Sequence, residues 1–145
     1  MNLSNSFNTK DSLNLGANRT QFTGNLDIAL GDGNDSVSNG AFKNGDSLDA
    51  GAGDDTVAIM ATGSDGISTF SSLNMTKLDG GSGVDTLDFS SSTTGGAEIN
   101  LISGGAVNFE NLLGSKYQET IEGDANANLI AGDDGADTLY GYAGD

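Results

Sequence analysis

The chain of 145 residues is long enough for one domain and combines a formal net charge of −16 with 23 glycines. It contains no cysteine, which excludes disulfides and thiolate chemistry. Its five basic residues against 21 acidic ones disfavour nucleic-acid binding, where phosphate contacts dominate the affinity. Leucine, isoleucine, valine and phenylalanine supply only 31 residues, near the boundary where a highly charged chain fails to fold.

Residues 1–25 carry no repeat signal and are predicted as an N-terminal segment or cap of unclear role. The stretch Met1–Phe7 lacks the basic start and the apolar run of a cleavable secretion signal. No stretch of apolar residues approaches the length that crosses a bilayer, so no membrane span is expected.

From residue 26 onwards a nine-residue pattern recurs. Leu30–Ser38 and Ala50–Ala58 are nearly complete copies, and Gly80–Asp88 fills every defining position with Gly-Gly-Ser-Gly-Val-Asp-Thr-Leu-Asp. Weaker copies begin near Gln21, Ala41, Ser71 and Gly105, and four further repeats run without interruption from Gly114, Gly123, Gly132 and Gly141. The pattern is that of a calcium-binding nonapeptide solenoid.

The eighth position of the repeat is always aliphatic. In chain order it is occupied by Ile28, Val37, Leu48, Val57, Leu78, Leu87, Leu112, Ile121, Ile130 and Leu139. We expect a three-residue strand centred on each of these residues, with the aliphatic side chain inward and its two neighbours facing water. Nine residues then make a half-coil, and eighteen complete one turn of an all-β, parallel β-roll (a flattened β-solenoid).

The first six positions of each repeat have the composition of a tight turn that binds a cation. Glycines at the second and fourth positions permit positive backbone angles, so that carbonyls converge on one point, and the aspartate at the sixth position adds a carboxylate. Stacked turns should lie roughly 4.7–4.9 Å apart. Calcium, with six to eight oxygen ligands at roughly 2.3–2.6 Å, can therefore bridge two of them. Several Ca²⁺ ions are expected, and an all-oxygen site disfavours zinc, copper or iron.

Alternation of the half-coils assigns each turn to one edge of the solenoid. When the loose copy near Ser71 is counted, Asp35, Asp55 and Asp85 fall on one edge as consecutive rungs, and they are the first candidates for metal ligands. Their turns contribute the glycines Gly31, Gly33, Gly51, Gly53, Gly81 and Gly83.

Further candidate ligands have poorer neighbours. Asp46 lies on the opposite edge, where the next turn presents Thr76 at the sixth position. Asp137, in the turn with Gly132 and Gly135, follows a turn that offers Glu119. The repeat at Gly123 has Asn128 at the sixth position, which loses a charge, so weaker or partly empty sites are expected in these C-terminal repeats.

Two insertions interrupt the expected roll over 26–145, near 59–77 and near 89–104. The insertion near 59–77 mixes apolar and polar residues, a composition that fits either a short helix or a hairpin covering one edge. The second contains Ser90–Gly96, which has the composition of a loop. Packing caps on an imperfect roll are the simpler interpretation, and a partner-binding loop is the alternative.

Over residues 26–145 the chain resembles the repeats-in-toxin (RTX) family, also called hemolysin-type calcium-binding repeats. The segment Ala97–Leu113 is similar to the stretch that leads into such arrays in large secreted bacterial proteins. The resemblance implies a calcium-bound β-roll, type I export, and folding outside the cell or at its surface. The last repeat stops at Gly144-Asp145, so the chain is interpreted as part of a larger parent protein and expected to act as a calcium-dependent scaffold.

Other functions fit the residues less well. An EF-hand beginning at Asp124 is rejected because Leu129 stands where that loop needs glycine and Gly135 where it needs glutamate. The adjacent aspartates of the turns have a simpler role as calcium-loop residues than as an acid–base pair, so no enzymatic activity is expected. An adhesin or ligand-binding module that contacts a host protein, a carbohydrate or a neighbouring domain remains the alternative function. Ice binding is weaker, because the outward strand positions lack regular threonine ladders.

Overall fold

The computed structural model describes residues 2–4, 10–15, 24–40, 42, 45–60, 75–93, 98–101 and 106–144. Short strands dominate these ranges: β1 (Asn2–Ser4), β2 (Ser12–Asn14), β3 (Asp27–Ala29), β4 (Ser36–Gly40), β5 (Ser47–Asp49), β6 (Thr56–Ile59), β7 (Lys77–Asp79), β8 (Thr86–Asp88), β9 (Glu98–Asn100), β10 (Ala106–Val107), β11 (Asn111–Leu113), β12 (Thr120–Glu122), β13 (Leu129–Ala131) and β14 (Thr138–Tyr140). A 3-10 turn, η2 (Tyr142–Gly144), follows the last strand.

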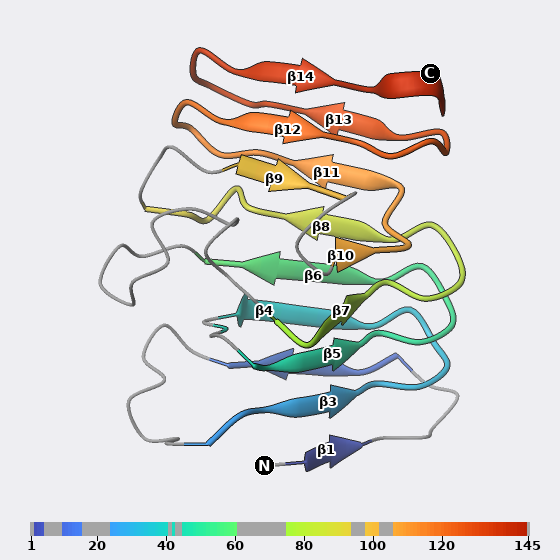
Figure 1. Ribbon diagram of the computed structural model, residues 1–145. Coiled ribbons are helices and arrows are strands. Elements are labelled where there is room, and N and C mark those ends of the chain that lie inside the picture. The colour runs from blue at the N-terminus through green and yellow to red at the C-terminus, as the bar shows by residue number, and fades with distance from the viewer. Residues whose placement is uncertain are drawn as a thin grey trace.

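The strands form parallel sheets stacked as the rungs of a solenoid, with β1 at one end and β14 at the other (Figure 1). Sheet I has the order β1-β3-β5-β7-β10, and sheet II has the order β13-β11-β8-β6-β4-β2. Strands β9, β12 and β14 form a third sheet, sheet III. Because consecutive strands alternate between sheets, the chain winds as the predicted parallel β-roll.

Strand register aligns the eighth positions of the repeats in columns. On sheet I, Ile28 pairs with Leu48 and Leu48 with Leu78. On sheet II, Val57 pairs with Leu87, which pairs with Leu112. Of the remaining eighth-position residues, Val37 is the second residue of β4, and the others occupy the middle of β12, β13 and β14. The sequence prediction of a strand around each aliphatic position is therefore confirmed, although β4 has five residues and β6 has four where three were expected.

The core lies between the sheets and consists mainly of these columns. Strands β5, β7, β8, β11 and β12 share one pattern, a buried central residue between two half-buried neighbours. Phe42 and Phe109, which lie outside the strands, are also buried and add aromatic volume to the core. At the last strand the column is less covered, since Leu139 is 46% exposed whereas Leu87 is fully buried. Each turn thus buries few apolar atoms, which leaves a thin core.

The segment expected as an N-terminal cap of unclear role contributes two strands to the stack. β1 pairs with β3 and places Leu3 opposite Ile28, while β2 pairs with β4 and places Leu13 opposite Val37. The glycine-rich turn pattern is missing from residues 1–25, so the repeat does not mark these two strands in the sequence.

The two insertions differ in how much of them the structure describes. Most of the first, residues 61–74, lies outside the described residues, and its flanking Ile59 and Met75 are buried in the core. In the second, expected as a loop, residues 90–93 are turn and bend, but Glu98–Asn100 forms strand β9, which pairs with β12. The short segment Glu-Ile-Asn offers one central aliphatic residue to that pairing, without the turn that marks the repeats.

Candidate metal centre

Three glycine-rich turns lie one above another on the edge where the chain passes from sheet I to sheet II, called here the first edge (Figure 1). They span residues 30–35, 50–55 and 80–85. Backbone hydrogen bonds join them: the Ala52 N–H donates to the Gly31 carbonyl at 2.9 Å, and the Ser82 N–H donates to the Gly51 carbonyl at 2.9 Å. The turns therefore continue the sheet pairing outward from the strands.

Glycine is required in these turns because the stacked carbonyls leave no room for a side chain. Gly51 and Gly53 have φ of 108° and 132°, and Gly31, Gly33, Gly81 and Gly83 also lie at positive φ. A Cβ built on Gly51 would lie 1.9 Å from the Gly31 oxygen, and one built on Gly53 would lie 2.0 Å from the Gly33 oxygen. The carbonyls of one turn thus point at the backbone of the next.

Replacing Gly53 by alanine is expected to disrupt the stack. The backbone conformation alone costs about 1–3 kcal/mol for a residue with a Cβ, and the contact with the Gly33 oxygen adds to it. Gly24→Ala is a matched control, because a Cβ there would meet nothing within 4 Å. Thermal unfolding in saturating calcium should show a lower midpoint for Gly53→Ala only, and equal midpoints for both variants would contradict the stacked geometry.

Each of these turns contributes one buried carboxylate at its sixth position. Asp35, Asp55 and Asp85 are 2%, 1% and 0% exposed. The Asp35 N–H donates to Asp55 Oδ1 at 2.7 Å, and the Asp55 N–H donates to Asp85 Oδ1 at 2.8 Å. The N-terminal segment joins this ladder, since the Asp11 N–H donates to Asp35 Oδ1 at 2.7 Å. The three first candidates therefore lie on consecutive rungs of one edge.

The second oxygen of each carboxylate has no hydrogen-bond partner. Oδ2 of Asp35, Asp55 and Asp85 is buried and unpartnered. Burial raises the pKa of Asp85 to about 6, and the neighbouring charges of Asp55 and Glu110 add to the increase. Burial likewise raises the pKa of Asp55, with further contributions from Asp35 and Asp54. Charged carboxylates are thus unfavourable here unless a cation compensates them.

These residues fit a calcium ion better than any softer metal. The first edge supplies carboxylate and carbonyl oxygens, the hard ligands that calcium prefers. Each turn supplies one buried acidic side chain and several carbonyls, so a shared site needs only two carboxylates. Accordingly, no group of three or more His, Cys, Asp or Glu side chains suited to a metal occurs in the part of the chain that the structure describes.

The outward aspartates of sheet I already have a cation beside them. The Lys77 ammonium lies 2.6 Å from Asp49 Oδ2 and 3.1 Å from Asp79 Oδ2, and the hydrogen bond with Asp49 is the main reason that its pKa is raised. Lys77 and Asp49 are well exposed, so this pair adds little stability. The buried turn carboxylates carry the larger unfavourable charge.

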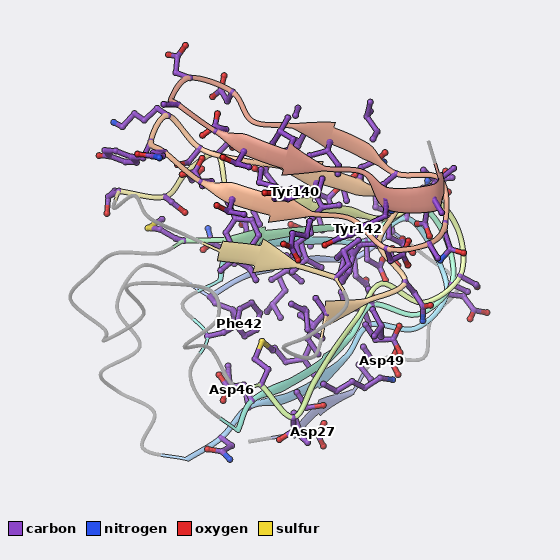
Figure 2. All side chains as sticks on the ribbon, turned by 45° about the horizontal axis from the view of Figure 1, so that its top comes forward. Asp27, Phe42, Asp46, Asp49, Tyr140 and Tyr142 are labelled. Atoms are coloured by element: carbon purple, nitrogen blue, oxygen red, sulfur yellow. The ribbon has the colours of Figure 1, made fainter. Side chains whose placement is uncertain are left out.

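Asp46 lies on the second edge, where the chain passes from sheet II back to sheet I. It is fully buried, and its Oδ1 accepts the Leu26 N–H at 2.9 Å. The turn above it presents Thr76, whose N–H donates to the Asp46 carbonyl at 2.7 Å. Asp46 and Phe42 come from the loop that leads into β5, and Asp49 ends that strand (Figure 2). Asp46 therefore has a threonine rather than a carboxylate as its rung neighbour.

The side-chain oxygens of the C-terminal candidates accept hydrogen bonds from neighbouring backbone and side-chain groups. Asp137 Oδ1 accepts the Glu119 N–H at 2.9 Å, which repeats the ladder of the first edge. Glu119 is buried, and its carboxylate accepts hydrogen bonds from the Ser115 N–H and hydroxyl of its own turn. Asn128 Oδ1 accepts the Asp124 N–H at 2.9 Å, and its amide donates to the Phe109 carbonyl at 3.3 Å.

The backbone of the turn at Gly132 also departs from the pattern of the first edge. Gly135 has φ of 137°, and a Cβ there would lie 2.3 Å from the Tyr117 oxygen. Asp133, at the second position, adopts φ of 65° where other turns have glycine. At Gly132 a Cβ would lie 2.5 Å from Asp137 Oδ2. This turn stacks on its neighbour without the second-position glycine.

Sequence reasoning missed one acidic residue of the first edge, Glu110, and gave Asp54 only a general role in its calcium loop. Glu110 Oε2 accepts the Asp85 N–H at 2.8 Å, so the ladder continues into a turn without the glycine pattern. Asp54 Oδ1 accepts the Val84 N–H at 3.0 Å on the exposed side of the turns. Glu110 stands at the sixth position of the loose copy near Gly105, and that spacing was the available signal.

Stacked glycine turns with one buried carboxylate each, on a parallel solenoid, define a calcium-binding β-roll. The RTX calcium-binding nonapeptide repeat family matches residues 44–58 and 113–145, with four copies. The chain carries repeats of this family, so the resemblance is confirmed, and these repeats bind calcium. The turns 30–35 and 80–85 lie outside the matched residues. Searches of curated proteins and of solved structures gave no match. Among the described residues, no helix has the length and apolarity to cross a membrane.

Proposed function

We propose that the chain is a calcium-dependent structural scaffold within a larger secreted bacterial protein. Calcium ions would lie between the turns of the first edge, held by Asp35, Asp55 and Asp85 and by the carbonyls of their turns. The remaining candidates, Asp46, Asp137, Glu119 and Asn128, would serve weaker sites. Asp46 has a threonine on the next rung, Asn128 is uncharged, and both carboxylate oxygens of Glu119, the rung neighbour of Asp137, already accept hydrogen bonds.

One observation carries this proposal. Three carboxylate oxygens on consecutive rungs are buried and lack a hydrogen-bond partner, although buried polar atoms in proteins are nearly always paired. A bridging cation supplies the missing partner for each oxygen and neutralises the carboxylates at the same time. The calcium-binding family to which the repeats belong supports the choice of ion.

The cellular setting is part of the same proposal. Extracellular calcium modules bind at roughly 10⁻⁴–10⁻³ M, far weaker than cytosolic buffers. A roll that folds only at such concentrations would stay unfolded during synthesis and type I export and would fold outside the cell. The net charge of −16 favours this order of events, since it opposes compaction until cations bind.

Isothermal titration calorimetry on the full chain tests the proposal. Calcium is expected to bind with multiple sites, whereas magnesium at the same concentration should bind poorly, because it prefers octahedral geometry at roughly 2.0–2.1 Å and retains its waters. Calcium-specific heat would support the proposal. Absence of calcium binding, or equal binding of both ions, would contradict it.

A further inference from the structure

The carboxylate ladder of the first edge does not stop at the last glycine-rich turn. The Asp85 N–H donates to Glu110 Oε2 at 2.8 Å, as the Asp55 N–H donates to Asp85 Oδ1. The strand that follows keeps the same pairing: the Asn111 N–H donates to the Asp85 carbonyl at 2.9 Å, as the Thr86 N–H donates to the Asp55 carbonyl at 2.8 Å. Glu110 therefore occupies the place of the sixth-position aspartate on the next rung.

The turn that carries Glu110 is shorter than the turns below it. Residues 108–110 separate β10 from β11, whereas residues 80–85 separate β7 from β8. The extra methylene of glutamate lets the carboxylate still reach the Asp85 N–H.

A backbone carbonyl of this short turn points at the same region as the unpartnered oxygen of Asp85. A Cβ built on Gly80 would lie 2.0 Å from the Asn108 oxygen and 3.0 Å from Asp85 Oδ2. Both distances start from one point, so the two oxygens are at most about 5 Å apart, a separation that two calcium ligands at roughly 2.3–2.6 Å can span. Asp85 Oδ2 is buried and has no hydrogen-bond partner.

The conformation of Asn108 holds its carbonyl in this position. Asn108 has φ of 56°, a left-handed conformation that asparagine tolerates better than most residues. Its amide donates to Asp79 Oδ1 at 2.8 Å, and the Gly80 N–H donates to the neighbouring Val107 carbonyl at 3.1 Å. The short turn thus takes at one residue the conformation that glycines provide in the other turns.

We propose that the turn of Asn108 and Glu110 forms a further calcium site with the turn of Gly80–Asp85. Asp85 Oδ2, the Asn108 carbonyl and the Glu110 carboxylate would contribute ligands. This inference rests on the proposed function, because it extends the same column of ions by one rung.

Counting the calcium ions bound by the full chain tests the inference. Equilibrium dialysis at saturating calcium should show one ion fewer for Glu110→Gln than for the unsubstituted chain, with unchanged strand content by circular dichroism. Glu122→Gln is the matched control, since Glu122 ends strand β12 on sheet III and its side chain is hydrogen-bonded with Tyr142 instead of joining the Asp85–Glu110 ladder, so this variant should bind the same number of ions as the unsubstituted chain. An unchanged number of ions in Glu110→Gln would overturn the inference.

Asp55→Asn separates this result from the proposed function. If Asp55→Asn binds fewer ions while Glu110→Gln binds as many as the unsubstituted chain, the further site is absent and the proposed function stands. If the unsubstituted chain binds no calcium, both are wrong. If Glu110→Gln fails to fold, a calcium-loaded crystal structure of the unsubstituted chain decides: an ion beside Asp85 Oδ2 and the Asn108 carbonyl supports the inference, and its absence overturns it.

Discussion

Removal of calcium is expected to unfold most of the β-roll. Circular dichroism of the full chain should show strand content in millimolar calcium and a largely disordered spectrum in excess chelator. The physical reason is the first edge: adjacent carboxylates at the spacing of strands, roughly 4.8 Å, repel by roughly 3–4 kcal/mol at an effective dielectric near 20. Two such contacts approach the roughly 5–15 kcal/mol of a whole domain's stability.

The thin core cannot compensate for this repulsion. Each rung buries mainly one aliphatic side chain per strand, such as Leu48 or Leu87, and a fully buried aliphatic contributes about 1.5–3 kcal/mol. That gain is opposed by about 1–2 kcal/mol of backbone entropy for each ordered residue. Because the site forms only when the turns stack, the free energy of calcium binding becomes free energy of folding.

Sodium and magnesium controls separate site binding from general screening. Sodium chloride at matched ionic strength screens the net charge of −16 but cannot bridge two carboxylates. It should restore little of the strand signal, and magnesium should restore less than calcium does. The same strand content in chelator and in calcium would show that the roll is stable without metal, and it would contradict calcium-dependent folding of the proposed scaffold.

Substitution of Asp55 by asparagine is expected to have the largest effect of any single side-chain change at the first edge. Asp55 lies between Asp35 and Asp85 in the ladder, so in the proposed column of ions it would belong to two neighbouring sites. Asparagine can still accept the Asp35 N–H that Asp55 Oδ1 accepts at 2.7 Å, but it lacks the charge and replaces the unpartnered Oδ2 with an amide nitrogen. The ladder is kept while the metal ligand is lost.

The calcium concentration at the folding midpoint measures this effect. It should rise by about 10–100-fold or more in Asp55→Asn. Loss of a group that only supports a metal ligand already weakens metal affinity by about 10–100-fold, and loss of a ligand should cost at least as much. Asp54→Asn is the matched control, because Asp54 is exposed and adjacent and its substitution removes the same charge. The Asp54→Asn midpoint should stay close to that of the unsubstituted chain, and equal shifts in both variants would indicate a general charge effect instead of ligation.

The spacing of the repeats was sufficient to predict most of the architecture. An aliphatic residue at the eighth position of each nine-residue repeat fits a short strand with one inward side chain, and glycines at the second and fourth positions fit a turn. Counting half-coils then placed Asp35, Asp55 and Asp85 on one edge, and the structure puts them on consecutive rungs. These predictions succeeded because each depends on local geometry that repeats along the chain.

Contacts between segments without the repeat could not be predicted in this way. Strands β1, β2 and β9 join the sheets through backbone pairing, which needs only one aliphatic residue and leaves little trace in the sequence. The hydrogen-bond partners of Glu119 could not be predicted from the sequence either, because its hydrogen bonds with Ser115 depend on the conformation of a single turn.

The amino-acid sequence by itself determined the repeat, its calcium-binding class and the edge on which Asp35, Asp55 and Asp85 lie, since these follow from residue types at fixed spacing. Only the tertiary structure decided which buried carboxylate oxygens lack a hydrogen-bond partner. It showed Oδ2 of Asp35, Asp55 and Asp85 unpartnered, Glu119 bound within its own turn, and Glu110 added to the ladder. Hydrogen bonding between stacked rungs is a property of the folded backbone, and the spacing of the repeat indicates only which residues share an edge.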